Sequence, residues 1–539
     1  MHTSFRPLAR LRPLAPALLF SARTLAAILC VSVGAMAQQA PGGFNVYEYV
    51  VDGNSLLDEG AIAASMAPFL GESKSLKDVE GARAALEKTY HDAGYLTVLV
   101  AIPEQSVDGG AVALHVVEAG IDKLRIKGAQ YTLPSAIRAQ VPELAEGKVP
   151  NFNKVQEQLS AVNRNGNVRV TPILRAGTVP GTVEVQLDAE DQLPLHGSVD
   201  VSNRQTPNTT ATRVGASLRY DNLWQRGHSF GMTLQTAPQR PTDARVLAAN
   251  YMVPVSASGA ALMVTALHSR SEFASLANSP GLGALGNSDI VGLRYSVPLG
   301  ASTTFSHSLT AGLDHKRVGQ SLTVNGSPGK DSAIHYSPVV ASYMARASDA
   351  RGSTAVDLNL SAGLRSVLNN RDEAFNASRP GASASFLAVR ATLARTQMLG
   401  NWSVFGRLDG QLASGSLVSS EQYSAGGAES VRGYLESERS ADSGARLNLE
   451  LRSPSYRPFG PSSDWAMTGL VFFDMARLSI HRPTAPQTAH SNLRGAGVGM
   501  RLSTPHGGAL ELDAAHPLVD GDLTRAGDNR IHARAVWSF

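Results

Sequence analysis

An arginine in a long polar segment and an aspartate in a later hydrophobic strand are the most chemically complementary pair in this sequence. Arg432 lies in Ser-Val-Arg-Gly-Tyr at residues 430–434, within a Gly/Ser/Glu-rich segment at residues 419–443. Asp474 ends the strand-like run Leu-Val-Phe-Phe-Asp, in which Phe472 points to the same face. If that face lines the inside of a barrel, the buried carboxylate needs a cation. An arginine on a loop folded back into the lumen would supply it.

Patterns for catalysis, metal binding or nucleotide binding are not found in the sequence. It has no Gly-x-Ser-x-Gly, no His-Glu-x-x-His, no cysteine pair and no glycine-rich phosphate loop. The 14 histidines are scattered, and no basic cluster indicates nucleic-acid binding. We therefore expect no enzymatic activity and no cofactor, metal, nucleotide or nucleic-acid ligand.

Residues 195–539 contain sixteen strand candidates with alternating apolar and polar residues. The clearest alternating runs are residues 214–220, 291–297, 356–360 and 447–451. A soluble β-sandwich also alternates, but here aliphatic residues on one face and charged residues on the other persist across nearly all strands. This pattern is typical of a barrel that faces lipid, and the chain ends on an aromatic residue, Phe539. We predict a mainly β protein with a 16-stranded antiparallel transmembrane β-barrel.

The polar face of these strands carries charges of both signs. They are Arg213, Arg219, Arg294, Arg390, Arg407, Arg452, Asp357, Asp409, Glu450 and Asp474. Two interpretations are open, a hydrated channel lining and a set of partners that hold a folded-in loop. We favour the first for most of them and the second for Asp474 with Arg432.

Short connections alternate with long ones along the strand-rich region. This alternation makes residues 416–443 the sixth external loop, between strands eleven and twelve.

The N-terminal segment has the layout of a secretory signal peptide. Residues 1–37 carry four arginines and no acid, followed by a short apolar run and Ala-Met-Ala. Its removal would change the formal net charge from +3 to −1 and would remove the only cysteine, Cys30. No later segment has eighteen consecutive apolar residues, so we expect no transmembrane helix.

Two units of similar plan lie between the signal and the strand-rich region. Residues 44–120 and 121–190 each give the order strand, helix, helix, strand, strand, with turn residues between the elements. From the residues alone, these two small α+β domains could be spacers as well as sites that bind an extended polypeptide at a sheet edge. A proline at Val170 or Val185 is expected to interrupt such an edge.

These features together resemble a known family. Val431-Arg432-Gly433-Tyr434, followed by Phe472-x-Asp474, is similar to the signature of the POTRA-plus-barrel insertase and translocase superfamily of the outer membrane. The two βααββ units resemble POTRA domains, and the whole plan resembles the two-partner secretion (type V) transporters of the TpsB, or FhaC/ShlB/HecB-like, haemolysin secretion/activation family.

The resemblance implies an outer-membrane translocator that secretes one large partner, of adhesin or haemolysin type, in extended form. It also implies periplasmic POTRA domains that bind this partner, a barrel in contact with outer-membrane lipid, and gating residues Val431, Arg432, Gly433, Tyr434, Phe472 and Asp474. The alternatives are an outer-membrane protein insertase, whose relatives usually have three or more POTRA domains, and a passive porin, which needs none. Family members usually begin with a pore-plugging helix, whereas only residues 38–43 precede the first POTRA strand, so we expect closure to depend on the folded-in loop.

Overall fold

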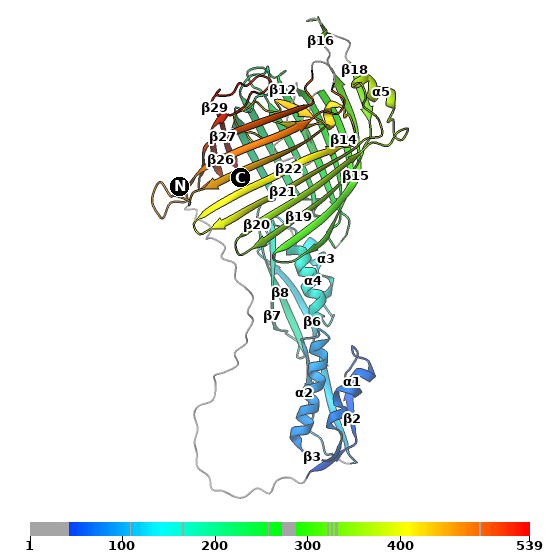
Figure 1. The fold of residues 1–539 in the computed structure, drawn as a ribbon. Helices are drawn as coiled ribbons and strands as arrows, with labels where there is room; N and C mark the ends of the chain where they lie inside the picture. Colours follow the sequence, from blue (N-terminus) through cyan, green and yellow to red (C-terminus); the bar gives the residue numbers. More distant parts are fainter. Residues whose placement is uncertain are drawn as a thin grey trace. The chain divides into compact units, whose positions relative to one another are not determined.

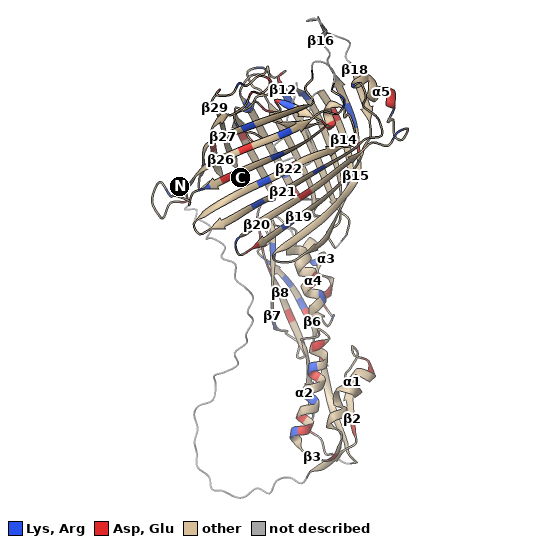
Figure 2. Ribbon diagram, in the orientation of Figure 1, with Lys and Arg blue, Asp and Glu red and all other residues tan. Residues whose placement is uncertain are grey.

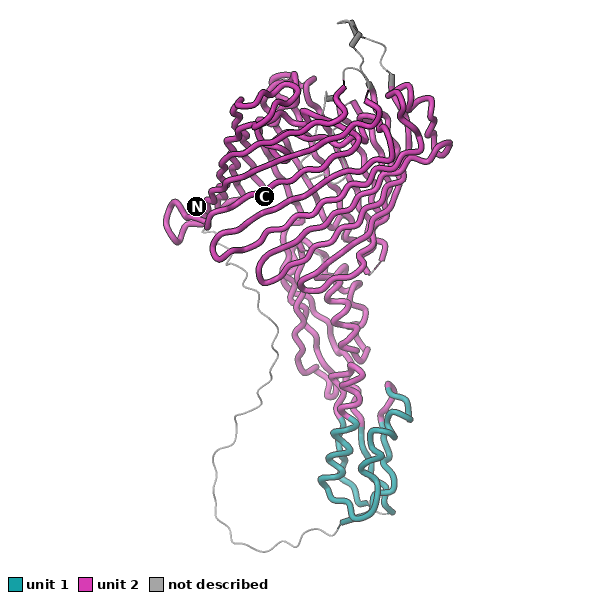
Figure 3. Tube along the Cα trace, in the orientation of Figure 1, with its two compact units in different colours: residues 1–52, 57–86, 100–115 teal, residues 53–56, 87–99, 116–539 magenta. Residues whose placement is uncertain are grey.

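A computed structural model describes residues 43–107, 109–163, 166–256, 258–271, 287–320, 323–324, 327–328, 332–483 and 487–539. The predicted signal peptide and residues 38–42 lie outside this range. The chain forms two compact units (Figure 3). One comprises Met1–Asp52, Leu57–Leu86 and Val100–His115, and the other comprises Gly53–Leu56, Glu87–Leu99 and Val116–Phe539. No helix within the described ranges is long and apolar enough to cross a membrane.

The first βααββ domain is built on a three-stranded sheet in the order β2-β5-β4, with β2 parallel to β5. Its elements are β1 (Phe44–Val46), β2 (Glu48–Asp52), α1 (Glu59–Met66), η1 (Ala67–Phe69), β3 (Gly71–Lys74), α2 (Leu76–Asp92), β4 (Val98–Ala101) and β5 (Ala111–Glu118). The extended segment that opens the domain is divided at Tyr47 into β1 and β2. The N–H groups of Tyr47 and Glu48 both donate to the carbonyl of Gly110, at 2.7 and 3.2 Å, and β1 pairs with β3 in a separate sheet.

The second domain repeats the plan, with its sheet in the order β6-β8-β7. Its elements are β6 (Gly120–Lys127), α3 (Pro134–Gln140), η2 (Pro142–Leu144), α4 (Phe152–Asn163), β7 (Val168–Ala176) and β8 (Thr182–Asp191). Val155, Leu159 and Val162 recur at helical spacing on α4 and pack on buried strand residues. Asp191 accepts the N–H groups of residues 130–132. Burial raises the pKa of Asp191, but these hydrogen bonds outweigh it and hold the pKa below its ordinary value.

The rest of the chain forms a closed antiparallel barrel (Figure 1). Its strands are β9 (Leu195–Ser202), β10 (Arg213–Leu223), β11 (His228–Thr236), β12 (Ala244–Pro254), β13 (Ala261–Ser271), β14 (Asn287–Ala301), β15 (Phe305–Gln320), β18 (Ser332–Tyr336), β19 (Val339–Asp349), β20 (Gly352–Ala362), β21 (Leu387–Leu399), β22 (Trp402–Ala413), β25 (Ser443–Arg452), β26 (Ala466–Ser479), β27 (His490–Ser503), β28 (Gly508–Pro517) and β29 (Arg530–Ser538). Because β18 and β19 both pair with β15 and are separated only by Ser337 and Pro338, they form one interrupted strand. The described barrel therefore has sixteen strands, as predicted.

The barrel closes where β29 pairs with β9, over residues 534–538 and 198–202. The outer face is apolar, as the alternation predicts: Val291 is 55% exposed and Leu293 51%. On the same strands, Asp314 and Arg294 point inward and form an ion pair at 3.0 Å between neighbouring strands. Figure 2 shows acidic and basic residues interspersed with uncharged ones along the barrel strands.

Long and short connections alternate around the barrel, with one exception. The connection between β25 and β26, residues 453–465, is long although it lies on the side of the short turns. On the other side, residues 363–386 include α5 (Asp372–Ser378). The remaining short elements are β16 (Thr323–Val324), β17 (Ser327–Pro328), η3 (Ser419–Glu421), β23 (Tyr423–Ala425) and β24 (Arg439–Ala441). We call residues 363–386 loop 5 and residues 414–442, between β22 and β25, loop 6.

Candidate functional site

Loop 6 is folded into the barrel and does not extend into solvent. Its β23 and β24 pair as a short hairpin, and we call residues 426–438, which connect them, the tip. The side chains of the hairpin and tip form a buried cluster with inward-facing residues of β26 and β27. Its members are Tyr423, Ala425, Val431, Tyr434, Ala441, Ala476, Leu478 and Leu493. The loop is therefore packed against the barrel wall inside the lumen.

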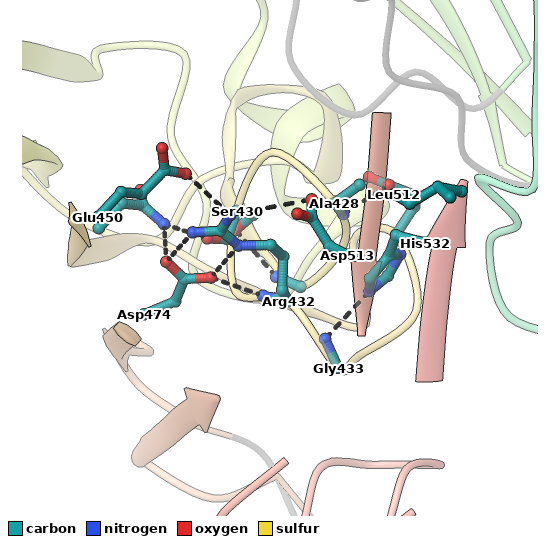
Figure 4. Close-up of polar contacts among 12 residues, drawn as sticks. Ala428, Ser430, Arg432, Gly433, Glu450, Asp474, Leu512, Asp513 and His532 are labelled. Atoms are coloured by element: carbon teal, nitrogen blue, oxygen red, sulfur yellow. Dashed lines mark hydrogen bonds and ion pairs between the residues drawn. The ribbon is translucent and has the colours of Figure 1, made fainter. Parts of the chain in front are cut away.

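The predicted pair of Arg432 and Asp474 is in direct contact (Figure 4). The guanidinium donates from Nε to Oδ2 at 2.7 Å and from Nη2 to Oδ1 at 2.9 Å, which is a bidentate fork. The side chain of Arg432 is 4% exposed and that of Asp474 is fully buried. Phe472 shields the pair, because the guanidinium carbon lies 3.5 Å from the centre of its ring.

Two further carboxylates approach Arg432, and sequence reasoning did not connect them with it. Nη1 donates to Glu450 at 2.8 Å and lies 3.8 Å from Asp513. Glu450 and Asp513 each have an arginine of their own on the barrel wall, Arg452 and Arg501. Arg432 is thus the cation that the loop contributes to a network spanning β25, β26 and β28.

The backbone of the tip is also hydrogen-bonded to side chains of the barrel wall. The N–H of Arg432 donates to Asp474 at 3.1 Å, and the N–H of Gly433 donates to Nε2 of His532 at 3.0 Å. Gly433 has φ +102°, a conformation that L side chains rarely adopt. The Tyr434 hydroxyl contacts two backbone carbonyls, those of Arg494 and Val519, at 2.9 and 2.7 Å. Each residue of the predicted motif therefore contacts the wall.

Three glycines on β27 lie where other groups pack closely against the strand, the tip at Gly495 and the Phe472 ring at Gly497. Gly495, Gly497 and Gly499 alternate along one face of the strand. A Cβ at Gly495 would overlap the carbonyl oxygen of Arg432, and one at Gly497 would lie 2.6 Å from the Phe472 ring. Glycine at every second position of a strand indicates close approach of another backbone. This signal was present in the sequence and would have identified the wall against which the tip packs.

The polar residues predicted to line the lumen divide into two groups. Asp409 and Glu450 contact loop 6, Asp409 through the hydroxyl of Tyr423, so more acids hold the loop than Asp474 alone. Others pair along the wall, as Arg294 does with Asp314 and Arg346 with Asp357. Below the tip, charged side chains line a cavity of about 240 Å³, among them Arg204, Arg407, Arg534 and Glu511.

A lipid-facing barrel that follows POTRA-like domains and holds one loop in its lumen is the architecture of a POTRA–barrel protein of the outer membrane. The model of the family described as haemolysin secretion/activation protein ShlB/FhaC/HecB matches residues 181–502. A second model, the ShlB-type POTRA domain, matches residues 44–119. The chain belongs to this family, and it is an outer-membrane two-partner secretion transporter with POTRA domains in the periplasm.

Known relatives agree with this assignment. The chain is 24% identical over 410 residues to the outer membrane transporter CdiB of Dickeya dadantii, covering 76% of this chain and 72% of the relative. It is 21% identical over 508 residues to the heme/hemopexin transporter protein HuxB of Haemophilus influenzae, covering 89% and 84%.

Solved structures share the fold. CdiB from Escherichia coli superposes with a TM-score of 0.60 at 19% identity, covering 94% of this chain and 93% of that one. BamA from Haemophilus ducreyi lacking POTRA domains 1–3 superposes with a TM-score of 0.55 at 14% identity, covering 92% of this chain and 100% of that one.

Proposed function

We propose that loop 6 is the gate through which a secreted partner polypeptide passes in extended form, and that Arg432 with Asp474 holds this gate closed. The observation that carries the proposal is the buried fork between the tip and the barrel wall. A loop that only connected two strands would not place an almost completely buried arginine among three carboxylates, because such burial costs free energy unless the charge is paired and hydrogen-bonded.

A passing chain would need the space that the tip occupies. The tip contacts β25, β26, β27 and β29 through Glu450, Asp474, Arg494 and His532. Glu438, at the end of the tip, accepts the N–H groups of Leu435, Leu523 and Thr524 and the Thr524 hydroxyl. Release of these contacts would open the lumen toward the cavity below the tip.

Replacement of the tip tests the gate directly. We expect that exchanging residues 426–438 for a short Gly-Ser linker gives a barrel with a large, constantly open conductance in planar bilayers. Heat-modifiable migration on gels would show that the barrel is folded. An unchanged conductance in a folded barrel would contradict the gate.

We infer further that the partner is captured by strand addition in the second POTRA domain, at the C-terminal end of the edge strand β7. Two positions were expected to test this edge. Val185 lies on the central strand β8, and the backbone N–H and carbonyl of Val170 are already hydrogen-bonded. The Asn163 side chain accepts the N–H of Val170 at 2.7 Å and donates to its carbonyl at 3.0 Å. A side-chain amide therefore takes the place of an added strand at Val170.

The alternation of an antiparallel ladder locates the open part of this edge. Since Val170 directs its backbone groups away from β8, Pro172, Leu174 and Ala176 do so as well. Pro172 has no N–H to offer. Leu174 and Ala176 remain available to an extended chain, and the Leu174 side chain is 42% exposed. An extended chain that pairs with residues 174–176 would be held by main-chain hydrogen bonds, so many sequences could bind there.

Insertase and porin functions are the alternatives. BamA from Haemophilus ducreyi shares the fold over 92% of this chain, but the matched sequence family is that of the secretion transporters. A passive porin would have no use for POTRA domains. In a strain that lacks this transporter, we expect one partner to remain unsecreted while other outer-membrane proteins assemble normally. This outcome distinguishes secretion from the insertase and porin functions.

A further inference from the structure

A second buried carboxylate of loop 6, Glu421, lies before the β23 strand and faces a different part of the wall. Its Oε1 accepts from Nζ of Lys316 at 2.7 Å and from the Tyr336 hydroxyl at 2.6 Å, and its Oε2 accepts from the Ser361 hydroxyl at 3.1 Å. The side chains of Lys316 and Glu421 are 8% and 6% exposed. We call Glu421 and these three hydrogen-bond donors the Glu421 cage, and it has no residue in common with the Arg432 network.

Loop 5 covers this cage with aromatic side chains. Tyr336 is fully buried, and its ring packs edge-on against Phe375 of α5, with centroids 5.2 Å apart, and against Phe386 at 6.3 Å. Leu417 and Val418, at the start of loop 6, belong to the same apolar cluster. An ion pair enclosed in this way is shielded from water, so removal of one partner would strand the other charge.

The stem of loop 6, which we define as residues 416–425 and 439–442, is fixed at its other end as well. Asp442 is fully buried and accepts the N–H groups of Leu417 at 2.9 Å and His481 at 2.7 Å, together with the guanidinium of Arg379 from loop 5. The hydroxyl of Tyr423 donates to Asp409 on β22.

The junctions between stem and tip have the backbone of a hinge. Gly426 and Gly427 have φ +110° and +108°, and Ser437, just before β24, has φ +53°. The N–H of Ser437 donates to the carbonyl of Gly426 at 3.2 Å, so the two junctions face each other. Glycines permit large changes of φ and ψ at little steric cost, which is what a hinge requires.

We propose that Glu421 is a positioning residue that clamps the stem of loop 6 to β15, β18 and β20, so that the channel opens by movement of the tip alone. The polar anchors of the tip and the stem differ: Arg432 pairs with carboxylates of β25 and β26, whereas Glu421 and Tyr423 bond to side chains of β15, β18, β20 and β22. Parts of both also pack in the buried cluster on β26 and β27. Loss of the Arg432 contacts would then release residues 426–438 and leave the stem seated. A fixed stem would return the tip to its site after each partner has passed. This inference rests on the proposed role of loop 6 as the gate.

Two single-cysteine reporters distinguish this hinge from withdrawal of the whole loop. The only natural cysteine, Cys30, lies in the predicted signal peptide. Ser430→Cys reports on the tip and Val418→Cys, in the cluster under loop 5, reports on the stem, at positions that are 7% and 1% exposed. Each is placed in the full chain with and without Arg432→Ala, and intact cells are treated with a membrane-impermeant maleimide.

We expect Arg432→Ala to expose the tip reporter and leave the stem reporter protected. Labelling of both reporters would overturn the fixed stem and leave loop 6 as the gate. Labelling of neither would overturn both proposals. In this way, the failure of this inference is distinguishable from failure of the proposed function.

The clamp itself is tested by removing one charge at a time. Glu421→Gln and Lys316→Met should each raise the labelling rate of Val418→Cys by at least about tenfold, because each strands a buried charge. The double variant has no stranded charge and should return toward the wild-type rate. The control is Arg346→Met, which breaks the Arg346–Asp357 pair between two wall strands and should leave labelling unchanged.

Equal labelling in the double and single variants would overturn the ion pair as the clamp. So would an unchanged rate in Glu421→Gln. Heat-modifiable migration, measured on every variant, separates a released stem from an unfolded barrel.

Discussion

Replacing Arg432 by alanine should unseat the tip of loop 6 and open the channel. The substitution removes three charge-assisted hydrogen bonds, two to Asp474 and one to Glu450, and leaves both carboxylates in a buried site. Removal of one partner of such a pair typically costs about 3–5 kcal/mol. At 1.4 kcal/mol per factor of ten, this corresponds to roughly a 140- to 3,700-fold rise in the ratio of released to seated tip.

The structure also orders the variants by severity. Asp474→Asn should be milder than Arg432→Ala, because the guanidinium keeps its contacts with Glu450 and Asp513. Arg432→Lys should be intermediate, since an ammonium keeps the charge but cannot form the fork. The double variant Arg432→Ala/Asp474→Asn should be no worse than Arg432→Ala and should open less, because residue 474 no longer carries a stranded charge.

Single-channel recording in planar bilayers measures the open fraction of each variant, and export of the partner to the medium measures secretion. We expect a higher open fraction and severe loss of secretion, with normal amounts of folded barrel in the membrane. Arg294→Ala is the matched control, since it breaks a lumen ion pair with Asp314 that does not touch the loop. Wild-type secretion by Arg432→Lys, or equal opening by Arg294→Ala, would refute the specific role of the fork.

Two further predictions concern the glycines of β27 and the POTRA edge. Gly495→Ala should raise the open fraction, because a Cβ there overlaps the carbonyl of Arg432, whereas Gly469→Ala on β26 meets its nearest atom at 3.7 Å and should behave as wild type; equal conductance in the two would contradict the close approach. Leu174→Pro should abolish secretion while Leu174→Ala preserves it, because only the proline removes an outward N–H, and Pro172 shows that this row accepts proline. Normal secretion by Leu174→Pro would count against strand addition at this edge.

Local patterns in the sequence were sufficient for the plan of the molecule. Alternation with a period of two predicted the sixteen strands and the lipid-facing side, because each side chain in a strand must point either to lipid or to the lumen. The same parity argument placed Phe472 and Asp474 together on the inner face. The requirement of a buried carboxylate for a cation then indicated Arg432. These inferences depend only on neighbouring residues and on the energetic cost of an unpaired charge.

Contacts between distant strands were decided by tertiary structure. That Glu450, Asp513 and His532 also meet the tip depends on the stagger of β25, β28 and β29, which no local pattern specifies. Glu421 and Lys316 are 105 residues apart, and their pairing requires the barrel to be closed and loop 6 to be folded into it. The division of the first strand at Tyr47 likewise depends on the distant carbonyl of Gly110. A sequence states which residues need a partner, but the register of the closed barrel determines which partner each residue reaches.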